Sequence, residues 1–305
     1  MNLAALPDEI RRNDEERRRI YEEQEKSMSK TGKRLAPRKA APKQPKRILN
    51  AVEDKGTEKD WSWELTAGAN ANTYPPSVDL RKGNSWWARV WDQGRSGSCV
   101  GQAVSSVLFY HFVKSKMVPN YSRKYIPSRR DLWMASKETD TFTSYPTTMI
   151  EGAGTYIKNC LEVARKRGTV TEKVLKFDGD LSPLPEQHYN ALCSQLKIKS
   201  YYACDFHGTH GLKSWKYWLA NHGPIVARLS PDKQFMEASR RTPVLDNFKM
   251  GAIYGGHAIV ICGYDEEGNF LVRNSWGRSW GTRGYQWVSE LYARFAFTGS
   301  YGVAV

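Results

Sequence analysis

The stretch that decides the fold is DQGRSGSCVGQAVSSVLFYHFVKSK, residues 92–116. Valine, leucine and phenylalanine recur there at spacings of three and four, which predicts a helix over residues 99–116 with one apolar stripe. The glycines and serines before it place Cys99 at the helix N-terminus, where free backbone N–H groups and the helix dipole favour a thiolate. The structural interpretation of such a cysteine, taken alone, is a small buried residue at a helix start.

Working outward from this helix, the chain changes its periodicity once. Two further helices are expected over about residues 155–166 and 212–220, and Gly223-Pro224 stops the second of these. Beyond it, short β-rich runs separated by turns cover residues 225–229, 258–262, 270–273 and 285–288. Helices followed by antiparallel-looking strands predict an α+β fold with two lobes.

The N-terminal part differs in composition, so we expect two regions: a charged extension over residues 1–74 and a globular domain over residues 75–305. Pro7–Glu25 reads as a charged helix. Lys26–Val52 has nine Lys and Arg residues, no acid and three prolines, which cannot build a core and predicts a flexible or extended arm. A solvated linker, an arm that binds nucleic acid or an acidic partner, and a removable or inhibitory prosegment remain open.

Composition excludes several classes of protein. The 305 residues are 40% hydrophobic and 26% charged, as in ordinary globular proteins, and no run approaches the roughly 18–20 apolar residues of a membrane span. Five cysteines without a secretory signal predict reduced thiols and a cytoplasmic protein, not a disulfide scaffold. The net charge of +14 allows attraction to nucleic acid, an anionic surface or acidic substrates without choosing among them.

Two later motifs bear on chemistry. GGHAIV, residues 255–260, contains His257 at the start of a β run, and RNSWG, residues 273–277, contains Asn274. Taken singly, the histidine reads as structural and the asparagine as a turn residue. Together with Cys99, their order, spacing and flanking residues match one known arrangement.

This arrangement resembles the papain/cathepsin family of cysteine peptidases, over about residues 76–305. PSVDLR, residues 76–81, looks like the start of a mature papain-like domain, and Gln93 precedes Cys99 by six residues. The resemblance implies a papain-like fold with a helical lobe over about residues 75–200, an antiparallel, barrel-like strand lobe over about residues 201–305, and a cleft between them. It is similar to the plainer bacterial or viral forms, including phage proteins.

The resemblance also implies a set of catalytic roles. Cys99 would be the nucleophile, ionised by His257 as an imidazolium. The Gln93 side chain and the Cys99 backbone N–H would donate to the oxyanion. Asn274 would orient His257, and Trp276 would shield their hydrogen bond from water.

The substrate-binding positions and several other features of the sequence match the family pattern less closely. The family implies a backbone-binding strand at Gly152 and Gly154, and a pocket wall near Ala227, with Trp276 beside the substrate. Val100 stands where the family usually has an aromatic residue, and Ser96 where it has a disulfide cysteine. The spans from Cys99 to the other two motifs exceed the usual ones, which predicts insertions near residues 128–146. The N-terminal extension does not reproduce the family's prosegment pattern.

The leading hypothesis is a cysteine peptidase that acts on polypeptides and needs no metal or cofactor. Cys204, His207 and His210 have spacing that could ligate zinc, but their glycine-containing loop favours surface histidines. The alternative function is a structural or virion-associated papain-like protein whose basic arm, Lys26–Val52, binds nucleic acid or a partner. A third is acyl transfer from the same thioester to an amine. The oligomeric state stays open.

Overall fold

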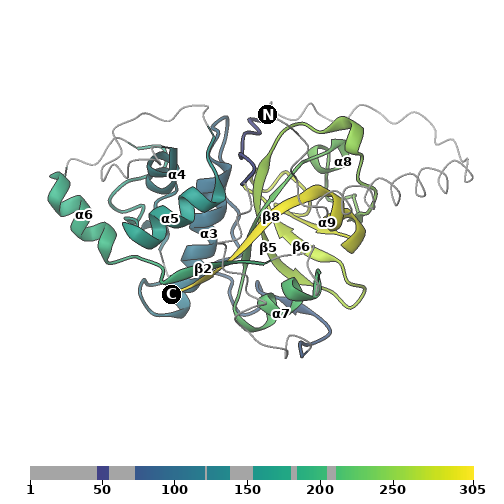
Figure 1. Ribbon diagram of the computed structural model, residues 1–305, viewed down its shortest axis with the longest axis horizontal. Coiled ribbons are helices and arrows are strands. Elements are labelled where there is room, and N and C mark those ends of the chain that lie inside the picture. The colour runs from purple at the N-terminus through teal and green to yellow at the C-terminus, as the bar shows by residue number, and fades with distance from the viewer. Residues whose placement is uncertain (1–46, 55–72, 121, 138–153, 180–183, 205–210) are drawn as a thin grey trace, which may run out of the picture. The chain divides into compact units, whose positions relative to one another are not determined.

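The computed structural model of the protein describes residues 47–54, 73–120, 122–137, 154–179, 184–204 and 211–305 (Figure 1). A compact unit runs over Lys46–Val305, and Met1–Pro45 forms the other unit. The helix expected at Pro7–Glu25 lies outside the described residues, as does most of the basic arm. Residues 47–54 differ from the expectation, because they pack within the compact unit instead of extending away as part of a flexible arm.

Helices dominate one part of this unit and strands the other (Figure 1). The helices are α3 (Cys99–Lys114), α4 (Arg129–Lys137), α5 (Ile157–Lys166), α6 (Glu186–Ser194), α7 (Lys213–Asn221), α8 (Lys233–Met236) and α9 (Glu290–Ala296). The strands are β1 (Val78–Asp79), β2 (Ser200–Ala203), β3 (Ile225–Leu229), β4 (Val244–Leu245), β5 (His257–Tyr264), β6 (Phe270–Arg273), β7 (Tyr285–Val288) and β8 (Phe297–Ala304). No helix in the described ranges combines the length and apolar character needed to cross a membrane.

The eight strands form one sheet in the order β2-β8-β3-β5-β6-β7-β4, and β1 pairs with β5. All pairs are antiparallel except β4 with β7. Every residue of β5 is buried, which explains its almost uninterrupted apolar sequence. His257 is its first residue, so a fully buried strand carries the candidate histidine.

Helix α3 is buried far more completely than the predicted stripe requires. All residues from Cys99 to Phe112 are buried, because α4 and α5 pack on one side of α3 and the sheet packs on the other. Gly101 permits this approach: a Cβ there would lie 2.7 Å from the Cβ of Trp133 in α4. The helix ends at Lys114, two residues earlier than predicted.

Two hydrophobic clusters correspond to the two lobes. One surrounds α3 and includes Phe112, Leu161 and Val260, and the other lies on the opposite face of the sheet and includes Trp215, Phe235 and Ile259. Val260 and Ile259 alternate between the clusters because successive strand residues point to opposite faces. The α+β, two-lobe expectation is therefore confirmed.

The predicted strands at 225–229, 270–273 and 285–288 have the observed bounds, and β5 is longer than predicted at both ends. The first part of the region where insertions were expected is helix α4, whereas residues 138–153 lie outside the described ranges. All five cysteines are buried free thiols.

Candidate active site

Cys99 is the first residue of α3 and has no exposed surface. The turn before it is fixed by serines: Ser96 Oγ donates to the Gln93 carbonyl at 2.7 Å and lies 2.7 Å from Ser98 Oγ. The hydrogen bonds of Ser96 therefore hold this loop in place at the position where the family usually has a disulfide cysteine. Ser98 makes no side-chain cap, and the backbone N–H groups of Ala258, Val100 and Cys99 act to lower the pKa of the thiol.

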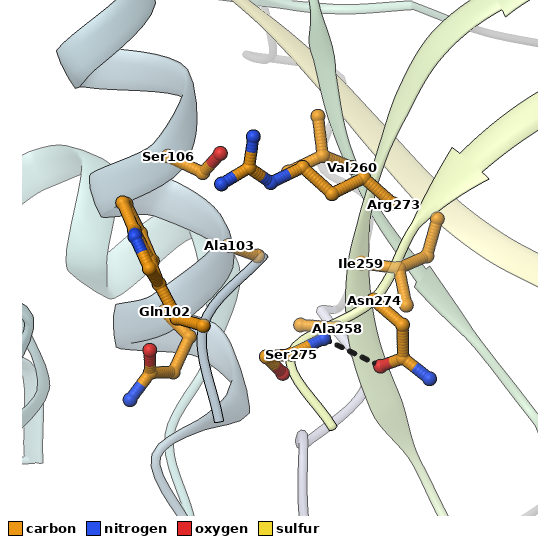
Figure 2. A pocket seen from close by; sticks show the side chains of 10 residues that line it. Gln102, Ala103, Ser106, Ala258, Ile259, Val260, Arg273, Asn274 and Ser275 are labelled. Atoms are coloured by element: carbon orange, nitrogen blue, oxygen red, sulfur yellow. Dashed lines mark hydrogen bonds between the residues drawn. The ribbon is translucent and has the colours of Figure 1, made fainter. Parts of the chain in front are cut away.

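His257 is the first residue of β5 and is held by the segment after β6. Its Nε2 lies 2.7 Å from Asn274 Oδ1. The same oxygen accepts from the Ser275 backbone N–H at 2.7 Å (Figure 2). Because that backbone group can only donate, it fixes which end of the Asn274 amide is the oxygen.

This assignment sets the tautomer of His257. Asn274 Oδ1 is an acceptor, so Nε2 carries a hydrogen, and in the neutral ring Nδ1 is then the basic nitrogen. Nδ1 is buried and makes no hydrogen bond with the residues that the structure describes. The unprotonated nitrogen that a thiol needs as its base is therefore left free.

Trp276 covers the histidine. The two ring centroids are 4.5 Å apart with an interplanar angle of 31°, and Trp276 is buried. Phe235 contacts both rings from the edge, with centroid distances of 6.0 Å to His257 and 5.6 Å to Trp276. Aromatic packing on this side keeps water from the His257–Asn274 hydrogen bond.

Gln93 is oriented by contacts at both ends of its amide. Its Oε1 accepts from Ser275 Oγ at 2.6 Å, and its Nε2 donates to the Ser96 carbonyl at 2.9 Å. The Gln93 backbone N–H also donates to the Ser275 carbonyl at 2.8 Å. These contacts use one Nε2 hydrogen, so the second is the one able to serve a developing oxyanion.

A segment of the chain itself lies across these groups. Residues 47–54, hereafter the covering segment, bridge the two lobes: the Ala51 N–H donates to the Gly256 carbonyl at 3.0 Å, and the Val52 N–H donates to the Thr155 carbonyl at 3.1 Å. The Ala51 N–H group also interacts with the Cys99 thiol. The backbone of the covering segment therefore occupies the cleft beside the candidate nucleophile.

Arg47 anchors one end of the covering segment. Its guanidinium donates to Asp92 Oδ1 at 3.0 Å and to the carbonyls of Gly94 and Trp276, both at 3.2 Å. The Arg47 side chain is only 5% exposed. The last basic residue of Lys26–Val52 is thus a structural anchor, contrary to our reading of it as part of a flexible or extended arm.

Burial of the site in this conformation keeps the reactive groups neutral. It raises the pKa of the Cys99 thiol despite the surrounding N–H groups. It lowers the pKa of His257 to about 4, an effect reinforced by Arg47 and opposed by the hydrogen bond to Asn274. The thiolate–imidazolium pair expected from the sequence is therefore disfavoured while the covering segment is in place.

The expected substrate-binding residues have different positions. Gly154 lies against the covering segment, since a Cβ there would come within 1.8 Å of the Asn50 carbonyl oxygen. Gly152 lies outside the described residues. Ala227 is buried in the cluster on the far face of the sheet. Its neighbour Arg228 points to the cleft instead and donates from Nε to the Ala51 carbonyl at 3.0 Å, because side chains alternate along β3.

The suggested zinc ligands cannot be assembled from this structure. Cys204 is buried at the end of β2, and His207 and His210 lie outside the described residues. Among the residues that are described, no group of three or more His, Cys, Asp or Glu side chains could hold a metal ion.

Sequence reasoning missed three contributors: Arg47, Ser275 and Arg228. The uncharged run ILNAV, residues 48–52, at the end of the basic arm was the available signal for a docked segment. Arg228 was one position from the predicted pocket residue, and strand alternation would have favoured it. Ser275 carried no separate signal, because its contact with Gln93 joins positions 182 residues apart.

Comparison with known proteins agrees with this geometry. The model of the papain family cysteine proteases matches residues 74–295. A peptidase C1-like protein of Acanthamoeba polyphaga mimivirus is 25% identical over 255 residues, covering 80% of this chain and 78% of that protein. A cathepsin L-like proteinase of Fasciola hepatica is 22% identical over 220 residues, covering 71% and 61%.

Among solved structures, the chain is similar to xylellain, a cysteine protease from Xylella fastidiosa. The TM-score is 0.66 with 21% identity, and the match covers 88% of this chain and 99% of xylellain. That similarity shows the fold, and the viral and bacterial matches agree with the resemblance expected from the sequence. The family match spans most of the chain, so the protein belongs to the papain family of cysteine proteases and is a cysteine peptidase.

Proposed function

We propose that this protein hydrolyses peptide bonds through a Cys99–His257 thiolate–imidazolium pair and a thioester intermediate. The observation that carries the proposal is the extended backbone already bound across Cys99. The covering segment hydrogen-bonds to Gly256 on one lobe and Thr155 on the other, so the cleft recognises peptide backbone from both sides. A polypeptide substrate would make the same kind of contacts.

The reaction begins when the Cys99 thiol transfers its proton to Nδ1 of His257. The thiolate then attacks the substrate carbonyl carbon, forming a C–S bond and placing negative charge on the carbonyl oxygen. The free Nε2 hydrogen of Gln93 and the Cys99 backbone N–H would donate to this oxyanion. Asn274 holds the Nε2–H side of His257 throughout, so Nδ1 remains directed at the chemistry.

Collapse of the tetrahedral intermediate breaks the C–N bond, and the amine leaves with the proton from Nδ1. Water then attacks the thioester while Nδ1 accepts one of its protons, and breaking the C–S bond releases the acid. The thiolate and imidazolium are regenerated. An amine in place of water would give acyl transfer by the same steps.

The covering segment makes the described conformation a resting state. Cys99 has no exposed surface, so a substrate can reach it only after residues 47–54 move or are removed. Of the three roles left open for the basic arm, an inhibitory prosegment is the one supported by these contacts. Binding of nucleic acid or an acidic partner by the remainder of Lys26–Val52 stays a prediction.

Cys99→Ala tests the mechanism in the full chain. We expect it to abolish peptide hydrolysis and thioester formation, measured by product release and intact mass, while thermal unfolding shows that the protein remains folded. Cys193→Ala is the matched control, since Cys193 is an equally buried thiol on α6. Hydrolysis that persists in Cys99→Ala would overturn the proposal.

Isotopic water separates hydrolysis from acyl transfer. In H₂¹⁸O, hydrolysis places one labelled oxygen in the new C-terminal carboxyl group. If the products are instead joined to an amine and carry no label, the function is acyl transfer through the same nucleophile and not hydrolysis.

A further inference from the structure

We infer that Arg228 makes the cleft select a peptide with an acidic side chain close to the bond that is cut. The inference rests on the proposed function and names the substrate class of the same site. It assigns to Arg228 a specificity role, distinct from the chemistry of Cys99 and His257.

The position of Arg228 directs its charge into the cleft. Its neighbours in β3, Ala227 and Leu229, are buried in the core on the far face of the sheet. Its side chain is 11% exposed and donates from Nε to the Ala51 carbonyl at 3.0 Å and from one terminal nitrogen to Thr298 Oγ1 at 2.5 Å. A Cβ at Gly256 would lie 2.7 Å from the other terminal nitrogen, so this glycine leaves room for the guanidinium.

The charge of Arg228 is balanced by a removable group. Glu53 in the covering segment lies 3.5 Å from the guanidinium, and Asp54, in the same segment, adds to the negative charge that acts on Arg228. Thr298 and the Ala51 carbonyl are neutral. When the covering segment leaves, the guanidinium, whose side chain is 11% exposed, loses its carboxylate partner, at a modest cost because the Glu53 side chain is itself largely exposed. A substrate that supplies a carboxylate restores the pair, whereas a neutral or basic side chain does not.

The register of the covering segment shows where that carboxylate belongs. The Ala51 N–H donates to the Gly256 carbonyl beside His257 and acts to lower the pKa of the Cys99 thiol, and Glu53 is two residues further along. In an extended chain, side chains two residues apart lie on the same face, about 7 Å apart. We therefore expect the acidic residue within about two positions of the scissile bond.

A competing role is purely structural. Arg228 also donates to the Ala51 carbonyl. If this were its only role, binding would not depend on the charge of the side chain beside it. Substitutions that change only the charge of the bound side chain separate these roles.

The first test uses the covering segment as the probe and needs no peptidase activity. Cys99 alkylation by iodoacetamide is followed by intact mass in the full chain. We expect Glu53→Lys to accelerate labelling by roughly two- to fivefold, with Glu53→Gln between it and the unmodified chain. In the Arg228→Glu background the order should reverse, so that Glu53→Lys slows labelling. An unchanged order in that background would overturn the inference.

The second test measures substrate choice. The full chain and its Arg47→Ala variant, whose covering segment has lost its anchor, are incubated with a peptide mixture, and cleavage sites are mapped by mass spectrometry. We expect Asp and Glu to be enriched at one position within two residues of the cut. A matched peptide pair with Glu or Gln at that position should differ in kcat/KM by roughly two- to fivefold, and Arg228→Glu should shift the preference to Lys.

Arg241→Glu is the charge-matched control, because Arg241 is exposed and outside the cleft; its selectivity should match that of the unmodified chain, and thermal unfolding verifies that each variant folds. Equal cleavage of the Glu and Gln peptides, in a Cys99-dependent manner, would overturn the inference and leave the proposed function intact. Loss of all Cys99-dependent cleavage would overturn the proposed function, and the alkylation experiment would still decide the charge preference.

Discussion

Two buried arginines, one in the helical lobe and one in the cleft, are balanced in different ways. Arg167 donates to both oxygens of Asp131 at 2.7 Å, and Asp131 has no exposed surface. Arg228 instead pairs with Glu53 of the covering segment at 3.5 Å, and the Glu53 side chain is 59% exposed. The first charge is neutralised by the fold itself, and the second by a segment that can leave.

The other hydrogen bonds in the two regions differ as well. Asp131 also accepts from Tyr189 at 2.7 Å and from Thr169 at 2.8 Å, so its carboxylate is fully satisfied within one lobe. In the cleft, His257 Nδ1, Asn274 Nδ2 and Trp276 Nε1 are buried without a hydrogen-bond partner among the described residues. Buried polar groups are normally satisfied, and three unsatisfied ones lie together around His257, although single ones such as Ser106 Oγ and His111 Nε2 occur in the helical lobe as well.

The largest effect should come from breaking the satisfied network. Asp131→Ala leaves Arg167 buried without its carboxylate, and we expect it to lower the free energy of unfolding by about 3–5 kcal/mol, measured by denaturant titration. Glu53→Gln is the comparison in the cleft and should change that free energy by less than about 0.5 kcal/mol, because the pair is partly exposed. Equal losses in the two variants would contradict the contrast between the regions.

Acid should release the covering segment before it weakens the fold. His257 has a pKa lowered to about 4 while it is covered, and exposure to water would return it towards 6.5. The uncovered form therefore binds the proton more tightly. The covered form is most stable above about pH 6.5. Below that pH, the equilibrium between the covered and uncovered forms shifts towards the uncovered form by up to about tenfold per pH unit.

The useful window is pH 5–6.5, which lies between the pKa of about 4 of the covered His257 and its ordinary value. Hydrogen exchange of the Ala51 and Val52 amides, corrected for the intrinsic pH dependence, measures release across it. We expect faster exchange at lower pH in the unmodified chain and a flat profile in His257→Gln. A slope that persists in His257→Gln would assign the effect to other groups.

Loss of the Arg47 anchor should have an intermediate effect. Arg47→Ala removes three hydrogen bonds from a charged donor, and we expect roughly 5- to 30-fold faster alkylation of Cys99, equivalent to about 1–2 kcal/mol. Arg47→Lys keeps the positive charge but loses the planar guanidinium, so its rate of Cys99 alkylation should lie between those of the unmodified chain and Arg47→Ala. Labelling of Arg47→Ala at the unmodified rate would mean that the covering segment is held elsewhere.

These contacts also mark the limit of what the sequence could predict. Periodicity predicted α3 and the main strands, and the family resemblance predicted Cys99, His257, Asn274 and Gln93 as catalytic residues, because each lies in a local pattern. Helix α4 and strand β8 were not predicted. The Gly and Ser residues in β8 weaken its strand signal, and its position is set by pairing with β2 and β3.

The covering segment was missed for a different reason. A composition window over the basic arm averages Arg47 and the uncharged residues 48–52 with many lysines, and predicts solvent exposure. Their burial depends on a cleft formed by Thr155, Gly256 and Trp276, which are distant in sequence. Such long-range contacts leave no local period, which is also why Ser275 was not recognised beside Asn274.

Ser275 provides the smallest and most specific test. Ser275→Ala removes the 2.6 Å hydrogen bond to Gln93 Oε1, worth about 1 kcal/mol, and allows the Gln93 amide to rotate. Because Gln93 would act on the oxyanion and not on the bound substrate, kcat should fall by roughly three- to tenfold with little change in KM. Ser98→Ala is the control, since Ser98 contacts Ser96 and Gln102 but not the Gln93 amide. A rise in KM at constant kcat would place Ser275 in substrate binding and remove the reason to connect it with Gln93.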